Sequence, residues 1–187
     1  MVKFLIAKKV DLTKPPNFVT DVDSDPSCAE NYRASPFIVQ AACHGSLEIF
    51  KLLIAAGCSM NDVGHICLSK RRQNAVVSNV VGGAAYHGNY DVLNYVFTKN
   101  KGATDMLDVK AIETADRRAD KSQFKHELNE FTPLQLAIVS NKPSLQSVKL
   151  LLSKEANYLV KVGATQDNVL HLCAKYQTNF PILKYLV

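Results

Sequence analysis

Residues 35–61 read SPFIVQAACHGSLEIFKLLIAAGCSMN. Ser35 can cap a helix, and Pro36 can stand in its first turn, where a missing N–H costs little. Gly45 interrupts the first apolar run, and Gly57 follows a second run rich in leucine and isoleucine, where a C-terminal cap belongs. The stretch therefore predicts two short antiparallel helices, neither of which can bury its apolar face alone.

The same pattern returns along the chain. Residues 41–45 and 84–88 share the order Ala-Ala-x-His-Gly. Residues 131–137 read FTPLQLA, in which a threonine can cap a helix and a proline can open it, and residues 167–174 read DNVLHLCA. The apolar triplets of the second helices follow one another at intervals of 35 to 55 residues. Such recurrence is typical of a repeat protein.

These motifs resemble the ankyrin repeat, which has a Thr-Pro-Leu-His start, a glycine between two helices, a Leu-Leu second helix and a Gly-Ala-Asp-Val-Asn end. The family period is about 33 residues, so every unit here is longer, and we expect enlarged connections. The resemblance implies an all-α fold, an α-solenoid of antiparallel helix pairs with long loops and short hairpins. It also predicts that residues 76–85 and 134–139 contain no β-sheet.

The resemblance divides the chain, taken as a single ankyrin-repeat domain over residues 1–187, into repeats and intervening segments. These are a partial repeat at 1–13, a loop at 14–34, a repeat at 35–61, an insertion at 62–78, a repeat at 79–104, an insertion at 105–130, a repeat at 131–158 and a partial repeat at 165–187. Because both ends fall within a repeat, we hypothesise that the chain is a piece of a longer protein. The alternative is that Met1 is a true start and the first helix is divergent.

Two of the intervening segments carry further patterns. In the second insertion, apolar residues that suit one helical face predict a helix: Met106, Leu107, Val109, Ile112 and Ala115. In the loop at 14–34, acidic residues are spaced like calcium ligands but lack the glycine and distal glutamate of an EF-hand. A solvated loop is therefore favoured over a calcium site.

Composition and net charge limit the cellular compartments and the kinds of partner that suit this chain. The net charge of +5 permits an acidic partner without requiring nucleic acid, and no aromatic residues alternate with the basic run as they do in single-strand binders. Five widely spread cysteines favour reduced thiols over a disulfide framework. No run reaches the ~20 apolar residues of a membrane span, and no secretory leader is recognised. We therefore expect a cytoplasmic protein with no membrane span in this chain and no nucleic-acid partner.

No catalytic, cofactor or metal site is predicted. Cys58, His65 and Cys67 lie within ten positions, but a zinc site usually shows paired ligands together with a second pair, which the sequence lacks. No nucleophile, base and oxyanion donor can be assembled into an enzyme site. The resemblance identifies His171, in the Leu-His-Leu step, with the internal hydrogen-bonding histidine of the family.

Two groups of residues are candidate partner contacts. Lys70, Arg71 and Arg72 form the one dense basic run, which a protein partner with an acidic surface would contact, and Tyr86 and His87 stand near the end of a first helix. A solvated loop face is the alternative for the basic run. The resemblance implies a non-catalytic protein–protein interaction module, a scaffold or structural subunit of a larger assembly, with cytoskeletal or ciliary complexes as one setting. The alternative is a regulatory ankyrin segment of a larger channel or enzyme whose active part lies outside this chain.

Overall fold

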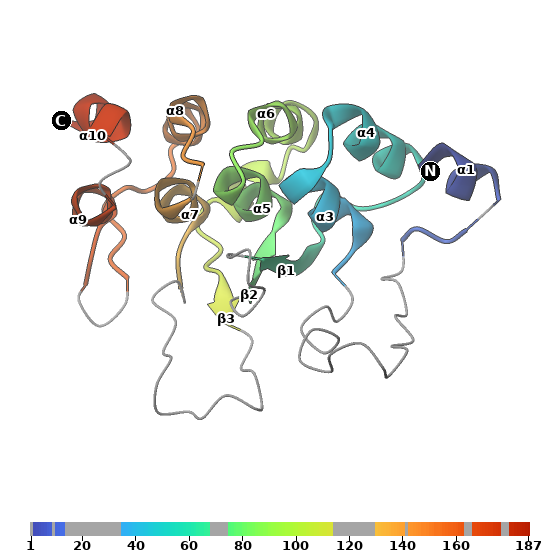
Figure 1. Cartoon of the computed structure of the whole chain (residues 1–187), viewed down its shortest axis with the longest axis horizontal. Coiled ribbons are helices and arrows are strands. Elements are labelled where there is room, and N and C mark those ends of the chain that lie inside the picture. The colour runs from blue at the N-terminus through green and yellow to red at the C-terminus, as the bar shows by residue number, and fades with distance from the viewer. Residues whose placement is uncertain are drawn as a thin grey trace.

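Figure 1 shows the computed structural model of the chain. The structure describes residues 2–8, 10–13, 35–67, 75–113, 130–140, 142–162, 166–176 and 180–187. The predicted loop at 14–34, with its acidic residues, lies outside the described residues.

Short helices lie side by side in two rows (Figure 1). The first row contains α3 (Phe37–His44), α5 (Val80–Tyr86), α7 (Pro133–Val139) and α9 (Val169–Lys175). The second row contains α1 (Val2–Ala7), α4 (Leu47–Ala55), α6 (Tyr90–Lys99), α8 (Leu145–Ser153) and α10 (Phe180–Leu186). Each first-row helix contacts the next first-row helix and also the second-row helix that follows it in the chain. The two helices predicted within residues 35–61 are therefore present as α3 and α4.

Local signals explain several helix ends. Asn79 Oδ1 accepts a hydrogen bond from the Gly82 N–H at 2.8 Å, which satisfies a donor that the first turn leaves unpaired and is worth about 1 kcal/mol. Gly57 has a φ of +95° just after the end of α4, as expected for a glycine at this cap. The cap predicted at Ser35 is wrong, because α3 begins directly after Pro36 without a side-chain cap.

The first row packs closely around α5, all seven residues of which are buried. Gly83 lies so near α3 that a Cβ there would stand 2.9 Å from Cys43 Sγ and 3.3 Å from Ile66 Cγ2. A larger residue would push these elements apart, because a close-packed core has little room to adjust. The small residues of α5 therefore set the spacing of the row.

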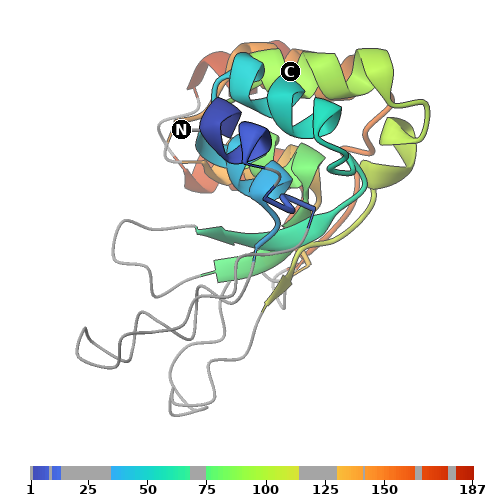
Figure 2. The same cartoon turned by 90° about the vertical axis from the view of Figure 1, so that its right-hand side faces the viewer.

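A three-stranded antiparallel sheet extends from one side of the helix rows (Figure 2). Its strands are β1 (Val63–Cys67), β2 (Ala75–Asn79) and β3 (Ile112–Glu113), in the order β1-β2-β3. Val63 pairs with Asn79, His65 pairs with Val77, and Val77 also pairs with Ile112 on the other side. The prediction of an all-α fold, and with it of an α-solenoid, is therefore wrong. The described chain is a mixed α and β structure.

The sequences of the two longer strands have a residue period of two. Alternate residues of β1 and β2 are buried: Gly64, Ile66, Val76 and Ser78. This period places them on the sheet face that meets the helices, and α3 contacts β1. The prediction that residues 76–85 contain no sheet is wrong for residues 76–79, which belong to β2. Residues 80–85 are helical in α5. Residues 134–139 are helical in α7, as expected.

One further helix prediction is wrong, the one based on Met106, Leu107, Val109, Ile112 and Ala115. Among the described residues of that segment, a short 3-10 helix, η1 (Ala103–Met106), is followed by extended backbone that leads into β3. Val109 is exposed, so the apolar residues do not share one face. The Ala111 N–H donates to the Phe131 oxygen at 2.9 Å, and strand pairing holds the segment as well, which favours extended backbone over helix.

Candidate functional site

Three side-chain amides connect the starts of first-row helices to segments further along the chain. The donors are Gln40, Asn79 and Gln135, and the acceptors are the backbone oxygens of His65, Met106 and Val160, at 3.0, 3.0 and 2.8 Å respectively. Each acceptor lies 25 to 27 residues after its donor. The same kind of contact therefore recurs in three successive units, and it holds the segment that leads toward the next helix pair.

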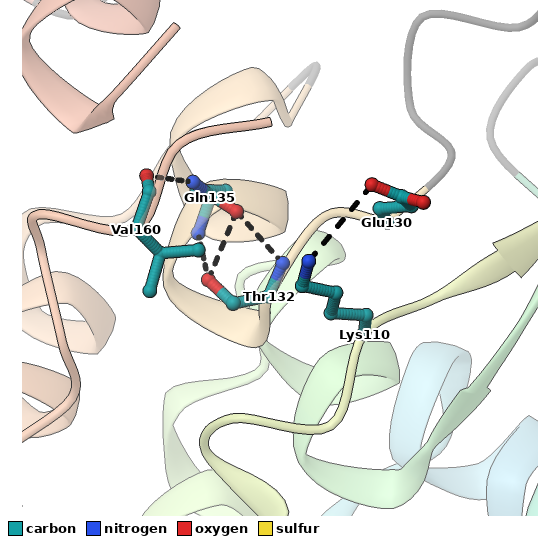
Figure 3. A network of polar contacts seen from close by, with 5 residues as sticks. All are labelled: Lys110, Glu130, Thr132, Gln135 and Val160. Atoms are coloured by element: carbon teal, nitrogen blue, oxygen red, sulfur yellow. Dashed lines mark hydrogen bonds and ion pairs between the residues drawn. The ribbon is translucent and has the colours of Figure 1, made fainter. Parts of the chain in front are cut away.

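Figure 3 shows the third of these contacts, around the wholly buried Gln135. Its Oε1 accepts from the Thr132 N–H at 2.9 Å and from the Thr132 hydroxyl at 3.1 Å, while its Nε2 donates to Val160. The Thr132 hydroxyl accepts from the Gln135 N–H and completes a capping box. One side chain thus both starts α7 and ties it to the segment after α8. The nearby ion pair of Lys110 and Glu130, at 3.9 Å, is exposed to solvent and contributes little.

A capping box of the same kind starts α9. Asn168 Oδ1 accepts from the N–H groups of Leu170 and His171 at 3.0 and 3.1 Å, and His171 Nδ1 accepts from the Asn168 N–H at 3.3 Å. His171 is the third residue after its cap, as Gln135 is after Thr132. His171 thus forms a hydrogen bond, but its predicted internal position is wrong, because the residue is exposed.

Another amide joins two successive helix pairs. Asn89 Nδ2, at the start of α6, donates to the backbone oxygens of Ala42 and Gly45 at 3.1 and 2.9 Å. These carbonyls belong to the end of α3, where a helix leaves its acceptors unpaired. The start of the second pair therefore satisfies the end of the first.

The ends of α3 and α5 bring two histidine rings together. The ring centroids of His44 and His87 lie 4.2 Å apart, with the planes at 64°, and the Tyr86 ring lies 5.1 Å from that of His87. Burial, and to a smaller extent the charge of Lys142, lowers the pKa of His44. Partial burial and this charge therefore favour the neutral form of the His44 ring.

The residues predicted to contact a partner differ in how much of each side chain is exposed. Tyr86 ends α5 and is only 4% exposed, so its side chain offers little surface to a partner. The same burial raises the pKa of Tyr86 to about 12. His87 follows as the C-cap and is half-buried. Lys70, Arg71 and Arg72 lie outside the described residues, so their role stays a prediction.

The outer face of the sheet is a surface that the sequence analysis missed. Val63 is 53% exposed, and the half-buried His65 and Val77 lie opposite each other on neighbouring strands. These residues share one face because they alternate with the buried residues of β1 and β2. Burial lowers the pKa of His65, so this face has little tendency to become charged near neutral pH. The alternation in residues 63–67 was the available signal.

The thiols of Cys58 and Cys173 are buried and pack within the core. Cys58 Sγ donates to the Leu12 oxygen at 3.2 Å, and burial, followed by the charges of Asp62 and Asp11, raises the pKa of this thiol. Burial likewise raises the pKa of Cys173 to about 11. Both groups are held as neutral thiols, whereas a metal ligand or a nucleophile must be a thiolate. Among the described residues, no group of three or more His, Cys, Asp or Glu side chains could hold a metal ion.

No protein-family model and no curated protein sequence matches this chain. Within the part of the chain that the structure describes, every helix is too short or too polar to cross a membrane. The helix rows, their amide links and the sheet are therefore the features that bear on function.

Proposed function

We propose that this chain is a non-catalytic protein-binding module that resembles ankyrin-repeat proteins and serves as a scaffold or structural subunit of a larger assembly. The observation that carries the proposal is the row α3–α5–α7–α9, in which each helix packs on the next and is paired with its own second-row helix. Stacked pairs of this kind hold side chains of different units at fixed distances, as extended binding surfaces require.

The packing supports a binding role because it orders the surface residues before a partner binds. All seven residues of α5 and of α7 are buried, and amide links hold the segments between the pairs. A partner that meets such a surface causes little further ordering of this chain, so less of the interaction free energy is lost. Interfaces on rigid scaffolds therefore bind well with few strong contacts.

The outer sheet face is the surface that we assign to the partner. Val63 presents apolar area there beside His65 and Val77. The basic run Lys70, Arg71 and Arg72 lies between β1 and β2 in the sequence. A protein with an apolar patch next to acidic residues would complement both features.

A cytoplasmic setting belongs to this proposal. Cys43, Cys58 and Cys173 are buried free thiols. Free thiols are typical of compartments whose redox buffers keep cysteine reduced.

The experiment captures partners on the immobilised chain and measures their binding by titration. Val63→Glu places a charge on the sheet face and should weaken binding by roughly tenfold or more, because it leaves a charge in a desolvated contact. Ile49→Glu on α4, at another exposed apolar residue, is the matched control and should bind as the original chain does. Charge reversal of Lys70, Arg71 and Arg72 to Glu should also weaken binding. This loss of affinity should become larger as the salt concentration is lowered.

Circular dichroism first establishes that each variant is folded. Equal binding by the Val63→Glu and Ile49→Glu variants would remove the sheet face from the proposal. Absence of any saturable protein partner, or turnover of a substrate by the chain, would overturn the proposed function.

A further inference from the structure

We draw no further inference here: the strongest candidate, the cluster of His44 and His87 where α3 and α5 end, brings two rings within 4.2 Å but has no third His, Cys, Asp or Glu among the described residues with which to hold a metal ion, and its response to pH belongs to the α3–α5 contact already described.

Discussion

α7 and α9 begin with the same local motif but differ in how much of each helix is buried. Each starts with a capping box in which the third residue after the cap binds the N–H of the cap residue. Every residue of α7 is buried, whereas α9 leaves four residues exposed: Leu170, His171, Ala174 and Lys175. The local motif is shared, so the difference comes from the neighbours of each helix along the row. A motif of this kind can start a helix anywhere, but packing stabilises it fully only where both sides are covered.

The largest expected effect separates the two leucines at matching positions. Leu134→Ala removes a wholly buried side chain and should lower the free energy of unfolding by about 3 kcal/mol. Leu170→Ala removes an exposed one and should lower it by only about 0.5 kcal/mol. Urea unfolding followed by circular dichroism measures both values. Similar losses for the two variants would show that position in the row does not govern stability.

A smaller effect should separate the two capping boxes. Gln135→Ala leaves the buried Thr132 N–H and the Val160 oxygen without their partner, at a cost of about 2 kcal/mol. His171→Ala removes one exposed cap bond and should cost about 0.5 kcal/mol. The same urea titrations measure these losses.

An exchange of residues between the boxes sharpens this test. Gln135→His gives α7 the residue that α9 carries and should recover part of the stability lost in Gln135→Ala. If it recovers nothing, the two boxes are not equivalent, and the comparison of α7 with α9 loses its basis.

The smallest effect concerns the first contact of the row, between α3 and α5. Burial lowers the pKa of His44 and of His65, so the unfolded chain binds these protons more tightly than the folded chain does. The stability that these neutral rings provide is complete above about pH 6.5 and decreases as the pH falls toward their lowered pKa values. His44→Gln should therefore flatten the decrease in the free energy of unfolding between about pH 7 and about pH 5.

Urea titrations at several pH values measure this slope. His65→Gln, in the sheet, should flatten it as well, and the double variant should flatten it further. A steeper decrease in His44→Gln would contradict the assignment, because it would mean that the charged ring stabilises the α3–α5 contact.

Part of the fold followed from short patterns. The Thr132–Pro133 step predicted the start of α7, and the Leu-rich second run of residues 35–61 predicted α4. The cap expected at Ser35 failed because the chain turns into α3 one residue later. The candidate surfaces were harder to predict, since Tyr86 looks like an accessible aromatic residue in the sequence but is covered in the structure.

The sheet was missed for a physical reason. Its two longer strands have five residues each, and their alternation mixes glycine and serine with valine and isoleucine. Such short segments gain stability only through pairing with a strand elsewhere in the chain. The apolar residues around Met106 even have spacings that suit a helix, yet the pairing of Ile112 with Val77 draws the backbone into extended form.

By itself, the sequence determined where several helices start and stop, because capping bonds and turn glycines act within three or four residues. Only the tertiary structure decided which faces are covered, that the fold includes a sheet, and that amides hold backbone oxygens 25 to 27 residues away. Those features depend on groups that meet only after the helix pairs have stacked. Thus Leu134 and Leu170, alike in local sequence, differ in everything that their neighbours control.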